Sequence, residues 1–154
     1  MVSDDVKADS FTSFVQATER PLRQALTAAA GPEAGRESTA EALAYGWEHW
    51  DRVGKLDNPA GYLYRVGRNL AKRMGRLEAR LAPVAERAEV WVEPGLPSAL
   101  ARLSEKQRVA VALVHGYGWS LSEAAAVLGV TKGTVQSYVD RGLKHLRKEL
   151  GVET

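Results

Sequence analysis

Apolar residues recur at spacings of three and four over much of the chain, which is the repeat of an amphipathic helix. At the amino-terminal end this pattern predicts a first helix from about Ser10 to Ala30, interrupted by Pro21. The apolar face of this helix is formed by Phe11, Phe14, Val15, Leu22 and Leu26.

A second amphipathic helix is predicted before the turn around Gly54. Breaks at Gly31, Pro32 and Gly35 separate it from the first helix. Its apolar face is expected to consist of Ala40, Leu43, Trp47 and Trp50. It also carries three acidic residues, Glu37, Glu41 and Glu48.

A third helix is predicted from Pro59 to about Leu81. Asp57 or Asn58 can cap its start, and proline suits the first turn because its missing N–H is not needed there. The apolar stripe of this helix is formed by Leu63, Val66, Leu70, Met74, Leu77 and Leu81.

The opposite side of the third helix is basic. Four cations follow one another at intervals of four and two more flank them: Arg68, Lys72, Arg76 and Arg80, with Arg65 and Arg73. Like charges at this spacing repel one another by a few tenths of a kcal/mol per pair. A bound anion would offset that repulsion, whereas a solvated helix face is the alternative interpretation.

No helical repeat persists from about Ala82 to Pro97, where prolines alternate with acidic residues. We interpret this stretch as a linker between two domains, residues 1–81 and residues 98–154. Each domain is small and is expected to be marginally stable alone.

The second domain begins with a predicted helix from Ser104 to about His115. Ser104 and Gln107 have the spacing of a capping box, and Gly116 and Gly118 end the helix.

Ser120 and Glu123 repeat the capping-box spacing and start a short helix, which Gly129 stops. Only Val130 and Thr131 separate it from the last helix, with Thr131 as the N-cap. Two helices joined by so short a turn meet at a sharp angle, which predicts a helix-turn-helix. A three-helix bundle with the same caps is the alternative.

The last helix has two distinct sides. Its packed side is formed by Val135, Val139, Gly142, Leu146 and Leu150. The opposite side consists of Gly133, Ser137, Asp140, Lys144 and Lys148, with Gln136 and Arg141 at its edges. This polar side can enter a major groove, although Asp140 would repel phosphate and could instead accept a hydrogen bond from a cytosine amino group.

The net charge of +2 conceals a segregation along the chain. Residues 1–60 carry −4, residues 61–81 carry +5, residues 82–99 carry −2 and residues 100–154 carry +3. Two basic blocks suit a polyanion such as nucleic acid, because each neutralised phosphate releases counterions.

Several function classes lack support in the sequence. With no cysteine there is no disulfide or thiol nucleophile, and His49, His115 and His145 are too scattered for a metal site. No phosphate-binding glycine loop or nucleophile–base set occurs, so neither an enzyme nor a cofactor is expected. The amino terminus is unlike a signal peptide and no segment is apolar enough to span a bilayer, which predicts a cytoplasmic protein without a membrane partner.

Two segments resemble a known family. The segment from His49 to Arg76, with WDRVGKLDNPAGYLYRVGRNLAKRMGR after the histidine, resembles the second conserved region of bacterial RNA polymerase sigma factors of the extracytoplasmic-function (ECF) group. The segment from Leu103 to Leu150 resembles their fourth region. The resemblance implies an all-α fold of two small helical domains, a region-two-like bundle and a region-four-like helix-turn-helix, joined by a linker.

The resemblance also implies a division of DNA contacts between the domains. The downstream promoter element, captured as a flipped single-stranded base, would contact Asp57, Asn58, Tyr62, Arg65, Arg68, Asn69, Lys72, Arg73 and Arg76. The upstream element would be read by Lys132, Thr134, Gln136, Ser137, Asp140, Arg141 and Lys144. Taken alone, Tyr62 and Tyr64 are each expected in the core rather than on DNA. Tyr138 departs from the family, which often has a basic residue there.

Docking on polymerase is implied for Glu37, Glu41, Leu43 and Trp47. In this helix ESTAEALAY, from Glu37 to Tyr45, replaces the family's usual acidic run with leucine and glutamine. Weakened docking would fit either a conditional sigma factor or a degenerate one.

The leading hypothesis is a sigma factor that directs core RNA polymerase to specific promoters and assists promoter opening. Its expected partners are core polymerase, promoter DNA and, as a further candidate, an anti-sigma factor. Two alternatives remain: a stand-alone helix-turn-helix regulator that binds duplex DNA without polymerase, and a degenerate sigma-like interaction protein that opens no DNA.

Overall fold

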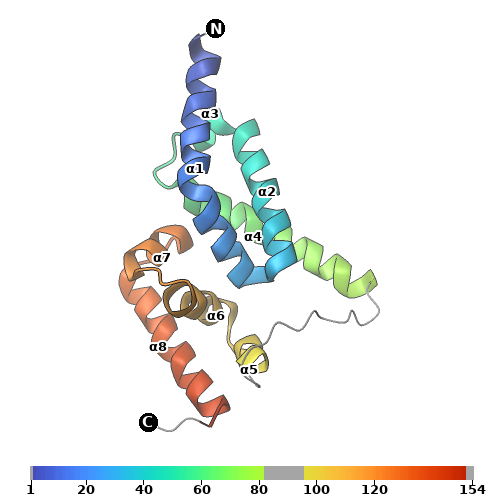
Figure 1. The fold of residues 1–154 in the computed structure, drawn as a ribbon, viewed down its shortest axis with the longest axis vertical. Helices are drawn as coiled ribbons and strands as arrows, with labels where there is room; N and C mark the ends of the chain where they lie inside the picture. Colours follow the sequence, from blue (N-terminus) through green and yellow to red (C-terminus); the bar gives the residue numbers. More distant parts are fainter. Residues whose placement is uncertain (1, 82–95, 152–154) are drawn as a thin grey trace.

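The computed structural model describes residues 2–81 and 96–151, and all regular secondary structure in these two stretches is helical (Figure 1). The first stretch forms the first bundle: α1 (Val2–Ala30), α2 (Pro32–Glu48), α3 (Trp50–Val53) and α4 (Pro59–Leu81). The second stretch forms the second bundle: α5 (Leu96–Arg102), α6 (Glu105–Val111), the π-helical turn η1 (Ala112–Gly116), α7 (Leu121–Leu128) and α8 (Lys132–Glu149). The predicted all-α fold is confirmed.

In the first bundle, α1 packs along α2 and crosses α4 (Figure 1). Leu22 and Leu26 of α1 are buried, with exposed fractions of 1% and 0%. The rings of Phe11 and Phe14 extend this core to Trp50, with centroid distances of 5.2 and 5.0 Å. The apolar face predicted for α1 therefore packs as expected, while Trp50, expected on the second helix, is buried in the separate helix α3.

The buried face of α2 is formed by small residues, and the face predicted from the sequence is wrong. Ala40 and Trp47 are exposed, and Leu43 is half-buried. The buried residues are instead Ala34, Gly35, Ser38, Thr39, Ala42 and Gly46. They allow a close approach of the backbones, because a Cβ atom on Gly35 would lie 2.6 Å from the Cα of Thr27. Gly35 was expected to break the chain, but it lies inside α2, where it lets α1 and α2 touch.

Two hydroxyl groups are buried in this contact. Ser38 and Thr39 donate hydrogen bonds to the carbonyl oxygen of Gly35, at 3.3 and 2.6 Å. A buried hydroxyl without a partner would cost free energy, whereas these two are satisfied within their own helix.

Two helix boundaries differ from the prediction. α1 begins at Val2, earlier than the predicted Ser10, and it continues through Pro21. The pattern does not reveal the earlier start because the exposed first turns have no apolar repeat that could signal a helix. α5 begins at Leu96, so the end of the predicted linker, residues 82–97, is helical. The remainder of that linker, residues 82–95, lies outside the described residues.

Asn58, rather than Asp57, caps α4. Its Oδ1 atom accepts a hydrogen bond of 3.0 Å from the backbone N–H of Gly61. Leu63 in the predicted apolar stripe is fully buried, and the next three members, Val66, Leu70 and Met74, are half-buried. The side chains of the last two members, Leu77 and Leu81, lie outside the described part of the chain.

The caps predicted for the second bundle are confirmed. Ser104 accepts a hydrogen bond of 3.2 Å from the N–H of Gln107. Ser120 and Glu123 form a reciprocal capping box with both hydrogen bonds at 3.0 Å. Gly129 ends α7 with a φ of 70°, a left-handed conformation that glycine adopts without strain.

The turn and the last helix complete a helix-turn-helix. Thr131 caps α8 by accepting a hydrogen bond of 3.1 Å from the N–H of Thr134. The packed side is as predicted, because Val135, Val139, Gly142 and Leu146 are buried, and Leu150 is partly buried.

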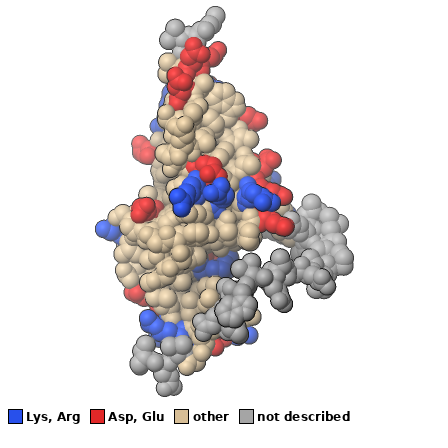
Figure 2. Space-filling model, viewed as in Figure 1, with Lys and Arg blue, Asp and Glu red and all other residues tan. Residues whose placement is uncertain are grey.

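Charged side chains are distributed unevenly over the surface. On the face shown in Figure 2, acidic side chains gather near the free end of α1, which carries Asp4, Asp5 and Asp9. Basic and acidic side chains lie together across the middle of this face (Figure 2). The acidic excess of the first sixty residues is thus concentrated partly at the start of α1.

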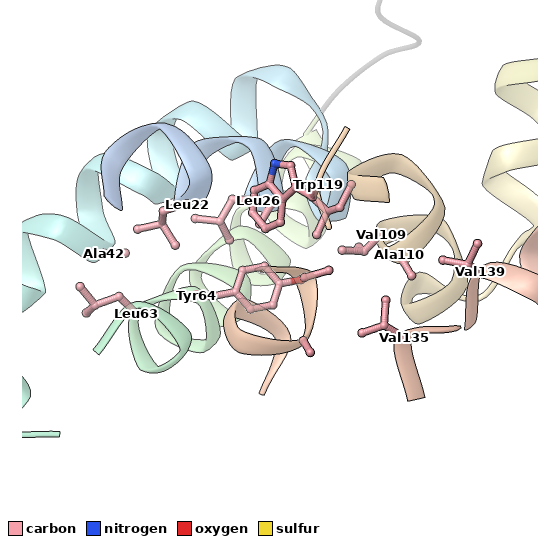
Figure 3. Packing of buried hydrophobic residues seen from close by; sticks show 14 of the residues in the cluster. Leu22, Leu26, Ala42, Leu63, Tyr64, Val109, Ala110, Trp119, Val135 and Val139 are labelled. Atoms are coloured by element: carbon pink, nitrogen blue, oxygen red, sulfur yellow. The ribbon is translucent and has the colours of Figure 1, made fainter. Parts of the chain in front are cut away.

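The two bundles share one apolar core (Figure 3). Tyr64 of α4 and Trp119, which precedes α7, lie between Leu26 on one side and Val109 on the other (Figure 3). Tyr64 is 5% exposed and Trp119 is 9% exposed. The second bundle therefore covers one side of α4, the helix whose basic side is predicted to contact DNA.

Burial makes Tyr64 the basis of an alkaline titration experiment. Burial, followed by the negative charge of Glu105, raises the pKa of the Tyr64 phenol from 10.0 to about 12. A raised pKa stabilises the folded state fully below pH 10, and that contribution is lost as the pH rises from 10 towards 12. We expect the phenolate absorbance of the wild-type protein to contain a late step near pH 12 that is missing in Tyr64→Phe. If Tyr64→Phe instead loses absorbance from the main step near pH 10, the burial of this phenol is contradicted.

Candidate nucleic-acid interface

The polar side of α8 faces outward. Six of the seven residues predicted to read the upstream element are exposed: Lys132, Gln136, Ser137, Asp140, Arg141 and Lys144. The seventh, Thr134, is half-buried, and its hydroxyl lies 2.8 Å from the hydroxyl of Thr131 in the helix cap. The structure thus brings six of these residues to one open helix face.

The second half of this face is cationic. A surface hollow of about 290 Å³ is lined by Arg141, Lys144, His145 and Lys148. Cations on an exposed helix face suit phosphate oxygens, because each contact releases counterions from the DNA. His145 was not among the predicted contacts, although its spacing after Arg141 places it on this side.

Asp140, the one acidic residue on this face, has a partner on its own helix. Its Oδ1 atom accepts a hydrogen bond of 2.8 Å from Nε2 of Gln136. The pair fixes the orientation of the Gln136 amide at the start of α8. Tyr138, in contrast, is half-buried against the shared core and does not belong to the exposed face.

The basic side of α4 is only partly free. Arg65, Asn69, Lys72 and Arg73 are exposed, whereas Arg68 is half-buried; the side chain of Arg76 lies outside the described residues. Arg68 and Lys72 both form ion pairs with Glu105 of α6. The sequence pattern predicts that the basic side of this helix is exposed. It does not show that Glu105, which lies 37 positions after Arg68 in the chain, packs against that side.

Tyr62 lies among cations and a second tyrosine. Arg52 donates one hydrogen bond of 3.3 Å to the Tyr62 hydroxyl and another of 2.8 Å to the Tyr45 hydroxyl. The guanidinium carbons of Arg52 and Arg65 lie 5.7 and 6.0 Å from the centre of the Tyr62 ring. A ring held in this way can stack on a base while the cations contact its phosphate.

The hydrogen bonds also affect the Tyr62 phenol. The bond with Tyr45, followed by that with Arg52, lowers the pKa of Tyr62 below 10.0. Tyr62 is half-buried, so the core interpretation favoured for each tyrosine holds fully for Tyr64 and only partly for Tyr62. Sequence reasoning missed Arg52 and Tyr45, since both lie outside the third helix and only the fold brings them to Tyr62.

Two further predicted contacts lie at the start of α4. Asp57 is exposed. The Asn58 side chain forms two hydrogen bonds. Its Oδ1 atom caps α4, and its Nδ2 atom donates a hydrogen bond of 2.6 Å to the carbonyl oxygen of Ala126 in α7. The second bundle therefore occupies one of the side chains predicted to contact the downstream element.

The predicted polymerase contacts lie on the outer part of α2. Glu37 and Glu41 are exposed, and Leu43 is half-buried against the core. Trp47 is 42% exposed and its ring lies 5.3 Å from that of Phe11. The ammonium group of Lys7 lies 4.9 Å from the centre of the Trp47 ring, and a partly exposed aromatic ring of this kind can anchor a protein partner.

The described residues contain no group of three or more histidine, aspartate or glutamate side chains that could hold a metal ion. Within the same residues, no helix is both long and apolar enough to cross a membrane.

Comparison with known proteins agrees with this geometry. Residues 95–146, which include the helix-turn-helix, match the family described as Sigma-70, region 4. The chain is 30% identical over 131 residues to the ECF RNA polymerase sigma factor SigL of Mycobacterium tuberculosis, covering 73% of each protein. It is 32% identical over 119 residues to the RNA polymerase sigma-E factor of Streptomyces antibioticus, covering 71% of this chain and 66% of the relative.

Solved structures share the fold. The sigma factor RpoE from Bartonella quintana, in complex with the anti-sigma factor NepR, superposes with a TM-score of 0.61 at 24% identity, covering 94% of this chain and 98% of RpoE. CnrH, in complex with the cytosolic domain of CnrY, gives a TM-score of 0.59 at 24% identity and 96% coverage of both chains. With the fold shared along nearly its whole length and SigL related over 73% of both sequences, the chain belongs to the ECF family of RNA polymerase sigma factors.

Proposed function

We propose that this chain directs core RNA polymerase to specific promoters and assists promoter opening at the start of transcription. Residues 1–81 form the domain that contacts core polymerase and the downstream element. Residues 98–154 form the domain that reads the upstream element, and residues 82–97 connect the two. The chain acts in the cytoplasm by binding, without a catalytic step or a cofactor of its own.

The observation that carries this proposal is the presence of two polar helix faces on different bundles of one sigma-family chain. The open face of α8 follows a tight turn, which suits insertion into a major groove. Arg65 of α4 and Arg52 of α3 lie beside the Tyr62 ring, a combination that suits a single strand whose bases stack on aromatic side chains. A promoter that is duplex upstream and melted downstream needs both kinds of surface.

The contact with core polymerase is assigned to the outer part of α2. Glu37 and Glu41 offer carboxylates to a basic surface, and Trp47 offers a partly exposed ring. Leu43 of the same helix is half-buried against the core. An anti-sigma factor is a further proposed partner, because RpoE, which shares the fold, was solved with one.

Transcription with purified components tests the function. We expect the purified chain to comigrate with core polymerase and to cause initiation at defined positions within a library of promoter fragments. Core polymerase alone provides the baseline. If no template supports initiation and no complex with core forms, the proposal is wrong. Complex formation without initiation would instead support the degenerate interaction protein.

The family assignment does not favour a stand-alone regulator. Such a protein would bind its duplex site with full affinity in the absence of polymerase. That affinity would be unchanged when the α4 cations are neutralised. Duplex binding alone therefore does not separate the two functions, whereas polymerase-dependent initiation does.

A further inference from the structure

Glu105, the first residue of α6, is held by two cations of α4. Nε of Arg68 donates to Oε1 of Glu105, and Nη2 of Arg68 donates to Oε2 at 3.2 Å. Nζ of Lys72 lies 3.4 Å from the same Oε2 atom. A guanidinium group binds two phosphate oxygens with the same parallel pair of N–H groups. The carboxylate thus uses the donors that a DNA phosphate would use.

We propose that Glu105 occupies the position of a DNA phosphate on α4, so that the second bundle and the downstream promoter strand compete for Arg68 and Lys72. This inference rests on the proposed function of α4. It makes the packed arrangement of the two bundles a closed state, in which the downstream contacts are blocked by the chain itself.

The charge state of Glu105 fits this role. Its side chain is 25% exposed and that of Arg68 is 32% exposed, so the pair is partly shielded from water. Burial acts to raise the pKa of Glu105, but the hydrogen bond and the charge of Arg68, together with Lys72, outweigh it and hold the pKa below 4.5. The carboxylate is therefore ionised at neutral pH, as a phosphate diester is.

The second bundle also binds another residue that is predicted to contact the downstream promoter element. Asn58 donates its hydrogen bond of 2.6 Å to the carbonyl oxygen of Ala126. The two occupied sites lie near the start and towards the middle of α4, so the second bundle covers an extended part of this helix. A strand that follows the basic row would meet α6 and α7 there.

Polar contacts to α1 hold the second bundle in place. Arg108 donates to the carbonyl oxygens of Ala28 and Ala29, at 3.4 and 3.1 Å. These carbonyls lie at the carboxyl end of α1, where a cation is favoured because the last carbonyls have no partners within the helix. Trp119 donates from Nε1 to Oε1 of Gln24 at 2.8 Å. The closed state is thus built from specific contacts of the second bundle with both α1 and α4.

The seam between the bundles is nevertheless incompletely filled. One cavity of about 270 Å³ is lined by residues of α1, α4 and α7, including Pro21, Ala60 and Val127. Another of about 220 Å³ lies between Tyr64 and Tyr138. Both cavities are open to solvent, so water can reach the edge of the contact between the bundles at two places. The apolar contact between the bundles is therefore interrupted there.

The upstream surface stays open in this closed state. The exposed side of α8 faces away from the seam, and among the residues that the structure describes none of its exposed predicted contacts hydrogen-bonds to the first bundle. The closed chain is therefore expected to bind upstream duplex while it excludes the downstream strand.

Paired substitutions test the competition. Glu105→Gln removes the carboxylate charge while keeping the side-chain size, and Glu149→Gln does the same at the Arg102–Glu149 ion pair within the second bundle. The probe is a short fluorescein-labelled oligothymidylate, which presents phosphates without a promoter sequence. We expect Glu105→Gln to bind it at least about fivefold more tightly than the wild-type protein, which is the lower range of typical coupling between sites. Glu149→Gln, which changes the net charge equally, is expected to differ by less than about twofold.

An equal change in both variants, or no change in either, would overturn the proposal. Thermal unfolding monitored by circular dichroism verifies that both variants are folded. Because the chain contains no cysteine, spin labels can be placed uniquely at exposed positions with Ser13→Cys on α1 and Ser122→Cys on α7. We expect a narrow distribution of distances between the labels that broadens in Glu105→Gln and when oligothymidylate is added.

The distance measurement separates this inference from the proposed function, because it uses no polymerase. A distribution that does not respond to Glu105→Gln or to the oligonucleotide would overturn the closed state and leave initiation unaffected. Absence of initiation with a responsive distribution would overturn only the proposed function.

Discussion

Gly35→Ala is expected to destabilise the protein by about 2–3 kcal/mol. A Cβ atom at this position would lie 2.6 Å from the Cα and 2.7 Å from the backbone nitrogen of Thr27. Because the atoms it meets belong to the backbone of α1, no side-chain rotation can relieve the overlap. The two helices would have to move apart, which would loosen the small-residue contact of α2. Chemical denaturation of the two proteins measures the change.

Gly75→Ala provides the matched control. Gly75 also lies within a helix, but no atom of the described part of the chain comes within 4 Å of a Cβ atom built there. Alanine has a higher helix propensity than glycine, so this variant is expected to be more stable by up to about 1 kcal/mol. The same chemical change should therefore act with opposite sign at the two sites. Equal stability of both variants would show that α1 and α2 are not in close contact at Gly35.

Arg141→Ala is expected to weaken binding to the preferred upstream duplex by about 1–3 kcal/mol, or roughly fivefold to 150-fold. Arg141 is exposed on α8, one turn after Ser137, and its planar guanidinium can bind a guanine edge through two hydrogen bonds. Its loss should reduce discrimination between the preferred and a random duplex. Fluorescence anisotropy with both duplexes, at several salt concentrations, measures affinity and specificity together.

Lys148→Ala serves as the comparison on the same helix. Lys148 lies near the end of α8, far from the amino-terminal turns that enter the groove. We expect it to contact phosphate, so its removal should weaken binding to both duplexes alike and reduce the salt slope by about one. An equal loss of affinity on preferred and random DNA for both variants would contradict the assignment of Arg141 to base recognition.

Local signals explain most of what could be predicted about the fold. Ser104, Ser120 and Thr131 are followed three residues later by the backbone N–H that each one caps, and Gly129 adopts the left-handed conformation that ends a helix. Such contacts lie within one turn of the chain, so their spacing in the sequence specifies them. The exposed face of α8 was predictable for the same reason.

Predictions failed where packing between distant segments decided the outcome. Large apolar residues were expected to face the core in α2, but Gly35 and its small neighbours are buried, because α1 and α2 approach too closely for larger side chains. Regular spacing of small residues was the available signal, and it was hidden by the stronger apolar signal of Leu43 and Trp47. In α4 the basic row was recognised, whereas its ion pairs with Glu105 were not.

The sequence by itself determined most of the helices, most of their caps, the helix-turn-helix and the two basic helix faces, because these depend on neighbours within a few residues. Only the tertiary structure decided which faces meet. It placed Arg52 and Tyr45 at Tyr62, and it placed Glu105 on Arg68 and Lys72. Contacts between residues far apart in the chain depend on how whole helices pack, and helical periodicity contains no information about which partner a face will find.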